Sequence, residues 1–193
     1  SYSVSHDLRA PLRHINGYVD LLNSRFKDQL PEKAQHYLDT ITDASKQMGQ
    51  LIDDLLHFSR TGKQEMRREF FEMNALVDEV IEKVKPDIEN RKVNWQIMKL
   101  PEVNGDYPLL KQVWINLISN ALKFSRDRDI TKISIGYKEE KGNYIFYIKD
   151  NGVGFDMKYV SKLFGVFERL HSQNEYEGTG IGLANVQRII HKH

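Results

Sequence analysis

The stretch Ser5-His-Asp-Leu-Arg-Ala-Pro-Leu12 lies in a segment whose apolar residues recur at steps of three and four. This spacing predicts a helix that buries one stripe of side chains. The stripe consists of Val4, Leu8, Leu12, Ile15, Val19, Leu22 and Phe26. His6 follows Val4 by about 200° around such a helix, so we expect its imidazole to point away from the stripe. On these residues alone, His6 is interpreted as a solvated surface histidine.

Two neighbours of His6 bear on its chemistry. The carboxylate of Asp7 could accept the imidazole N–H and make the other ring nitrogen a better nucleophile. Pro11 cannot donate a hydrogen bond to the carbonyl of Asp7, so we expect the helix to bend beside His6.

A second apolar stripe follows a polar turn at residues 27–32. Its members are Leu38, Ile41, Ala44 or Ser45, Met48, Leu51 or Ile52, Leu55 and Phe58. Pro31 suits the first position of this second helix. Two long amphipathic helices joined by a short turn form an antiparallel hairpin. Because one hairpin cannot bury both stripes well, we predict a homodimeric four-helix bundle.

The pattern changes after the polar residues 59–68, which predict a linker. The expected elements are a strand at 70–73, a helix capped by Asn74, a strand at 93–98, a helix at 106–124, strands at 132–137 and 144–149, and a helix at 180–193. Residues 155–177 have no clear period. This order favours an α+β sandwich. The prediction is an all-α hairpin at 1–59, a linker at 60–69 and an α+β domain at 70–193.

Composition excludes several classes of protein. The net charge of +1 gives no electrostatic footprint for binding nucleic acid. The chain has no cysteine, which excludes disulfides and thiolate metal sites and fits a reducing compartment. No apolar run approaches the roughly 20 residues that span a bilayer, and no signal peptide is found. We therefore expect a cytoplasmic fragment without a membrane span, whose parent protein could still be tethered to a membrane.

Two glycine segments of the second domain have features of a nucleotide site. Asp150-Asn-Gly-Val-Gly154 follows a predicted strand, where the carboxylate of Asp150 can accept from an amino group such as that of adenine. Gly178-Thr-Gly-Ile-Gly-Leu183 opens the last helix, where backbone N–H groups can approach phosphate oxygens. The second segment has neither P-loop nor dinucleotide spacing. Each segment alone is also typical of an ordinary tight turn.

A third stretch, residues 114–124, is a predicted helix that is largely apolar apart from two amides. Asn116 and Asn120 are four residues apart and so share one face. Buried amides need partners, and a hard cation with phosphate oxygens would supply them; bonds to loop backbone are the alternative. Lys123 can supply positive charge to phosphates, and Phe124 an apolar wall for a base.

With His6, these stretches resemble a sensor histidine kinase of the two-component systems over essentially the whole chain. The resemblance implies a dimerisation and phosphotransfer hairpin followed by a Bergerat-type ATP-binding domain. It implies that His6 is the phosphoacceptor oriented by Asp7, that Asn120 is the main Mg²⁺ ligand with Asn116 beside it, and that Asp150 reads adenine. The other implied ATP-binding residues are Lys123, Phe124, Gly152, Gly154, the lid residues Phe164 and Phe167, and Gly178, Thr179, Gly180, Ile181, Gly182 and Leu183.

The resemblance also implies what the protein does. His6 would be phosphorylated by ATP, and the phosphoryl group would pass to an aspartate on the receiver domain of a response regulator. Many relatives carry Thr or Asn where this chain has Ala10, so we predict weak phosphatase activity toward the regulator. The family usually continues past the last helix with Gly-Gly and closing strands, so we expect the ATP-binding domain to be truncated at its C-terminal end.

Two other functions are considered. An ATP hydrolase of the same superfold, like the chaperone and mismatch-repair ATPases, carries a glutamate at the position of Asn116, and an amide is a poor general base. A catalytically silent dimeric scaffold is disfavoured by the His6–Asp7 pair. His14, about 80° from His6 around the helix, could compete as acceptor but has no acid beside it. The remaining histidines are expected to be solvated: His36, His57, His171, His191 and His193.

Overall fold

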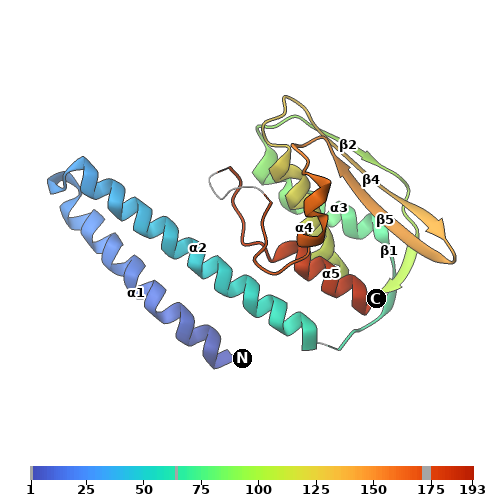
Figure 1. The fold of residues 1–193 in the computed structure, drawn as a ribbon, viewed down its shortest axis with the longest axis horizontal. Helices are drawn as coiled ribbons and strands as arrows, with labels where there is room; N and C mark the ends of the chain where they lie inside the picture. Colours follow the sequence, from blue (N-terminus) through green and yellow to red (C-terminus); the bar gives the residue numbers. More distant parts are fainter. Residues whose placement is uncertain (1, 64, 171–174) are drawn as a thin grey trace. The chain divides into compact units, whose positions relative to one another are not determined.

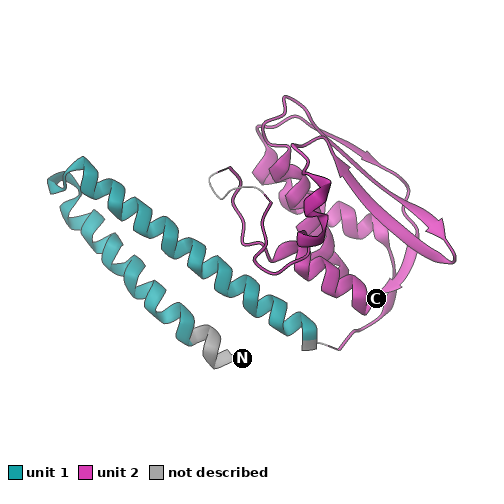
Figure 2. Ribbon diagram, in the orientation of Figure 1, with its two compact units in different colours: residues 1–62 teal, residues 63–193 magenta. Residues whose placement is uncertain are grey.

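The computed structural model describes residues 2–63, 65–170 and 175–193, with side chains for 7–62, 65–170 and 175–193. The chain divides into two compact units (Figure 2). We call residues 1–62 the helical hairpin and residues 63–193 the α/β unit. The predicted fold class, a helical hairpin followed by a sandwich of helices and sheet, is confirmed. None of the helices in the described residues has the length and hydropathy needed to cross a membrane.

The helical hairpin consists of α1 (Tyr2–Phe26), a 3₁₀ turn (Lys27–Gln29) and α2 (Glu32–Lys63), as Figure 1 shows. Helix α1 continues without interruption through Pro11. Pro31 precedes α2 and accepts hydrogen bonds at its carbonyl from the N–H groups of Ala34 and Gln35, so it is the N-cap and not the first helical residue as predicted. Helix α2 continues four residues past the predicted hairpin end at 59, and the predicted division into domains stays a prediction.

The seam of the hairpin is narrow. Arg9 on α1 donates through Nε to Asp53 Oδ1 on α2 at 2.8 Å, and Leu12 lies opposite Gly49. Leu12 and Val19 are buried. Most other members of the two stripes are exposed, namely Leu8, Ile15, Leu22, Phe26, Ile41, Met48 and Leu55. One hairpin therefore leaves much of its apolar surface uncovered.

The α/β unit places helices against a small mixed sheet (Figure 1). Its elements are β1 (Glu69–Glu72), α3 (Met73–Val84), a 3₁₀ turn (Lys85–Ile88), β2 (Val93–Ile97), β3 (Glu102–Gly105), α4 (Tyr107–Phe124), β4 (Thr131–Glu140), β5 (Asn143–Asp150), a 3₁₀ segment (Met157–Lys162) and α5 (Gly182–Lys192). Strand β4 pairs in parallel with β2 and antiparallel with β5. Strands β1 and β3 form a separate antiparallel pair.

Helix α4 is central to the packing of the α/β unit. One core lies between α3, α4 and the three-stranded sheet, and includes Leu76, Ile118 and Ile133, all 0% exposed. A second core joins α4 to α5 through Val113 and Ile189. Helix α4 is therefore held on two sides, which fixes the polar residues along it.

The structure corrects one prediction about this unit and adds contacts and elements that were not predicted. Asn74 lies inside α3 rather than capping it, because its side chain bonds the backbone of Leu100 and Met98. Strand β3 and the 3₁₀ segment at 157–162 were not predicted. His193 is exposed, as predicted, and its ring also accepts at Nε2 from the Asp106 N–H and donates from Nδ1 to the carbonyl of Ile189, each at 2.9 Å.

Candidate active site

The candidate site is built on helix α4. Asp106 caps this helix by accepting from the Leu109 N–H at 3.0 Å, the favoured role of an aspartate at a helix start. Asn116 and Asn120 are half-buried on α4, and the helix ends at Lys123 and Phe124. The predicted helix is thus confirmed, and it carries four of the predicted site residues.

The first glycine segment packs against the end of α4. The carbonyl of Phe124 accepts from the Val153 N–H at 3.1 Å. A Cβ on Gly152 would lie 2.6 Å from this carbonyl oxygen, so only glycine allows the approach. Asp150 is exposed at the end of β5, and its Oδ1 accepts from the Gly152 N–H at 2.8 Å. Its carboxylate is therefore oriented beside α4 with a second oxygen available.

Two residues that the sequence interpretation missed hold this segment in place. Arg128 donates through Nε to the carbonyl of Asn151 at 2.8 Å and through a second nitrogen to that of Gly152 at 2.9 Å. The Asn151 side chain bonds the backbone of Lys132 and Ile130. Arg128 follows α4 in a run of charged residues, where no sequence pattern distinguishes it from a solvated arginine.

The second glycine segment, residues 178–183, also lies against α4. Gly182, the first residue of α5, lies so close to Asn116 that an added Cβ would be 3.3 Å from its Oδ1. Gly180 has a φ of +74° and accepts from the Phe167 N–H at 3.1 Å. A Cβ on Gly180 would lie 2.8 Å from the carbonyl oxygen of Glu168. This segment and residues 167–168 therefore fit together only with glycine at 180.

Two cations converge on Gly178. Lys123 Nζ would be 3.2 Å from a Cβ on Gly178, and Arg169 donates to the Gly178 carbonyl at 2.7 Å. Burial lowers the pKa of Lys123, the like charge of Arg169 lowers it further, and Glu177 opposes the shift. A half-buried ammonium beside a guanidinium, next to the glycine segment that leads into α5, favours an anion. Arg169 lies in a segment without periodicity and was not predicted.

The remaining predicted site residues differ from one another in how exposed they are. Phe164 and Phe167 are exposed, as is Gly154, whereas Thr179 is half-buried. Ile181 is buried and Leu183 packs against the core between α4 and α5, so any contact of these two with a ligand would be through their backbone. Asp7 lies on α1 in the helical hairpin, and the side chain of His6 lies outside the described residues.

The residues on α4 fit a nucleotide carrying a divalent cation. The Nδ2 of Asn116 is buried without a hydrogen-bond partner among the described residues, and such a group calls for a ligand. The described residues contain no cluster of three or more carboxylate or histidine side chains that could hold a metal alone. Mg²⁺ typically takes one or two protein oxygens together with substrate phosphates, and amide oxygens suit that role.

Comparisons with protein families cover both units. Residues 1–64 match the His Kinase A (phospho-acceptor) domain family. Residues 105–193 match the family described as histidine kinase-, DNA gyrase B- and HSP90-like ATPase. The order of the two matches along the chain agrees with the expected phosphotransfer hairpin followed by an ATP-binding domain.

Individual relatives agree with these matches. Phytochrome-like protein Cph1 of Synechocystis is 35% identical over 193 residues, which are 100% of this chain and 26% of that protein. The methanogenesis regulatory histidine kinase FilI of Methanothrix harundinacea is 32% identical over 193 residues, 100% of this chain and 22% of that protein. The chain thus spans about a quarter of the length of these relatives.

Solved structures share the fold. Full-length ShkA in complex with AMPPNP aligns with a TM-score of 0.67 at 24% identity, over 97% of this chain and 39% of that one. Histidine kinase AdeS of Acinetobacter baumannii aligns with a TM-score of 0.62 at 24% identity, over 96% of this chain and 85% of that one. These likenesses show a shared fold, and the two family matches together with relatives such as Cph1 show that the chain belongs to the sensor histidine kinases and carries their catalytic core.

Proposed function

We propose that this chain catalyses ATP-dependent phosphorylation of His6 and then passes the phosphoryl group to an aspartate of a response regulator. The observation that carries the proposal is the convergence of two glycine segments on one helix. Gly152 packs against the end of α4, and Gly182 packs beside Asn116. This arrangement supports a nucleotide bound along α4, with its base near Asp150 and its phosphates near Lys123 and Gly178.

The chemistry of transfer needs alignment and neutralisation of charge more than covalent help. An imidazole nitrogen of His6 attacks the γ-phosphorus in line, the bond to the bridging oxygen breaks, and ADP leaves. Asp7 accepts the other imidazole N–H and stabilises the positive charge that develops on the ring. Lys123 neutralises phosphate charge, which its buried position makes more effective.

Asn120 and Asn116 would hold Mg²⁺ through their amide oxygens. When bound there, the ion supplies charge to neutralise the β- and γ-phosphate oxygens. The described residues fit a phosphate beside this ion, because the Nδ2 of Asn116 is a buried donor without a hydrogen-bond partner among them.

A second copy of the chain is the proposed partner of the helical hairpin. The exposed stripe residues Ile15, Leu22 and Met48 support this proposal, because large contiguous apolar surfaces mark interaction sites. We further propose that the receiver domain of the regulator docks on the hairpin near His6 and that the reaction takes place in the cytoplasm, where ATP and Mg²⁺ are available.

The decisive experiment incubates the chain with γ-labelled ATP and Mg²⁺ and follows label on the protein. We expect acid-labile, alkali-stable label that is lost in His6→Gln and kept in His14→Gln, the matched control on the same helix. Free phosphate without labelled protein would favour the ATP hydrolase. Bound nucleotide without either product would favour the silent scaffold.

Ala10 supports a further proposal about the removal of the phosphoryl group from the regulator. A methyl side chain cannot hydrogen-bond a water, so we expect this chain to dephosphorylate its regulator weakly. Ala10→Thr is expected to raise Mg²⁺-dependent loss of label from a phosphorylated regulator severalfold, with Ala10→Val, of similar shape, as control. Rapid dephosphorylation by the unaltered chain would contradict this proposal.

A further inference from the structure

Tyr176 is a buried side chain within an exposed stretch. It is 7% exposed, whereas its neighbours Glu175 and Glu177 are exposed. Its ring lies against Phe124, with 5.1 Å between ring centroids and the planes tilted by 56°. Such aromatic pairs stabilise a chosen geometry beyond the area they bury. The ring of Tyr176 therefore supports the residue expected to form the apolar wall for a base.

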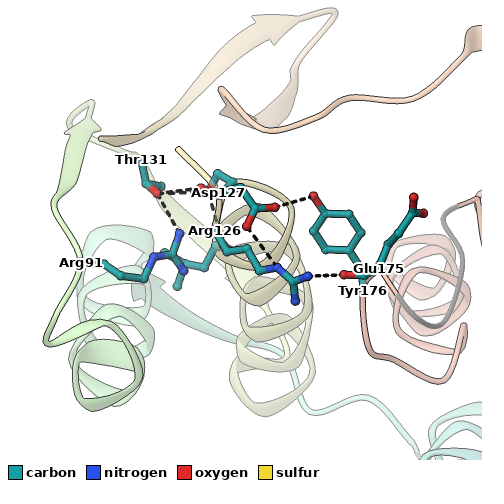
Figure 3. A network of polar contacts seen from close by, with 8 residues as sticks. Arg91, Arg126, Asp127, Thr131, Glu175 and Tyr176 are labelled. Atoms are coloured by element: carbon teal, nitrogen blue, oxygen red, sulfur yellow. Dashed lines mark hydrogen bonds and ion pairs between the residues drawn. The ribbon is translucent and has the colours of Figure 1, made fainter. Parts of the chain in front are cut away.

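The polar end of Tyr176 is bonded to the residues that follow α4 (Figure 3). Its hydroxyl donates to Asp127 Oδ2 at 3.2 Å. Arg126 lies over the ring at 4.6 Å from its centroid and donates to the carbonyl of Glu175. Burial and the hydrogen bond to Asp127 raise the pKa of Tyr176, so the hydroxyl keeps its proton and remains a donor.

The same stretch is bonded on its other side. Arg169 donates to the carbonyls of Tyr176 and Gly178, and the Phe167 N–H donates to the carbonyl of Gly180. Four carbonyls between 175 and 180 thus accept hydrogen bonds from outside the stretch, although it forms no helix or strand there. A segment held in this way is ordered before any ligand binds.

We propose that Tyr176 is a positioning residue that fixes residues 175–180 and the Phe124 ring, so that this side of the nucleotide site is formed before ATP binds. The inference rests on the proposed binding of ATP along α4. Tyr176 should then raise the affinity for nucleotide. The conformational entropy lost when residues 175–180 become ordered is lost during folding, so binding does not have to supply it. We expect the effect of Tyr176 on the transfer step to be small, because the contacts that carry this proposal all lie within the α/β unit.

The test measures KM for ATP and kcat of autophosphorylation, together with the dissociation constant of ADP, for the full chain and its variants. We expect Tyr176→Leu to raise KM and the ADP dissociation constant about tenfold while kcat changes less than about twofold. Tyr176→Phe keeps the ring and loses only the bond to Asp127, so it should recover most of the affinity. Tyr144→Leu, on β5, is the control and should leave both constants unchanged.

Limited proteolysis without nucleotide tests the anchoring separately. A glutamate-specific protease should cleave slowly after Glu175 and Glu177 in the unaltered chain, faster in Tyr176→Leu and, to a smaller extent, faster in Asp127→Ala, which removes the acceptor of the Tyr176 hydroxyl. Unchanged cleavage, unchanged KM, or a fall in kcat at constant KM would each overturn the proposal. If Tyr176→Leu does not fold, cleavage of Asp127→Ala decides the same question. If the unaltered chain binds no ADP, the proposed function fails, while proteolysis still decides the anchoring.

Discussion

The helical hairpin and the α/β unit differ in how completely they bury their apolar residues. In the α/β unit, Ile118 on α4 and Ile133 on β4 are 0% exposed. In the hairpin, Leu12 and Val19 are buried while Ile15 and Leu22 on the same helix are exposed. A domain of about 130 residues can enclose a core, whereas two helices cannot. The stability of the α/β unit is therefore intrinsic, and that of the hairpin depends on what covers it.

The largest expected effect tests the intrinsic stability of the α/β unit. Ile118→Ala leaves a cavity between α4 and the sheet and should lower the free energy of unfolding by about 2–5 kcal/mol. Ile118→Val, the conservative control, should cost about 0.5–1.5 kcal/mol. Denaturant unfolding followed by the fluorescence of Trp95 and Trp114, the two tryptophans of the chain, measures both. A loss that depends on protein concentration would mean that this unit also relies on a partner.

The next effect tests the dependence of the hairpin on a second copy. Ile15→Glu places a charge in the exposed stripe and removes an apolar side chain whose burial contributes about 1.5–3 kcal/mol. We expect the dimer dissociation constant to rise at least about tenfold in analytical ultracentrifugation. Ser24→Glu adds the same charge about 180° away around α1 and is the control. Equal effects of the two variants would remove the support for a dimer through this stripe.

The same contrast explains how much the sequence could predict. Helices α1, α2 and α4 have a periodic apolar pattern of their own, so their positions were predicted closely. Strand β3 is four residues long and depends on its pairing with β1, which a local pattern does not contain. The glycine segments could be recognised because a special backbone needs special residues.

Contacts between distant parts of the α/β unit could not be predicted in this way. Tyr176 and Asp127 are separated by 49 residues, and Asp106 and His193 by 87. Arg128 lies among other charged residues and Arg169 lies in a segment without periodicity, so only the folded structure distinguishes them from solvated arginines. The motifs thus indicate where a ligand lies, and the residues that support the motifs become visible only in three dimensions.

A third prediction concerns the charges of the two units. The Arg9–Asp53 pair of the hairpin is about half exposed, whereas Lys123 is held beside Arg169 with a lowered pKa. Bound phosphate favours the charged form, so ATP binding should take up protons as the pH approaches the pKa of free Lys123. Affinity should then fall as the pH rises toward the ordinary pKa of a lysine, beginning below it because the pKa of Lys123 is lowered.

Calorimetry in buffers of different ionisation enthalpy measures this proton uptake. Lys123→Arg stays charged throughout this rise in pH and should show little uptake and a flatter pH profile. An unchanged profile in Lys123→Arg would assign the dependence to another group.

The smallest expected effect tests which face of α1 contacts the second copy of the hairpin. A Cβ added at Gly17 meets nothing within 4 Å, and glycine inside a helix costs about 0.5–1 kcal/mol relative to alanine. Gly17 lies about 200° from Ile15 around α1, so a dimer formed through the stripe leaves it in solvent. Gly17→Ala should then stabilise the hairpin by that amount without changing the dimer dissociation constant. A weaker dimer would instead place the partner against the face of α1 that carries Gly17.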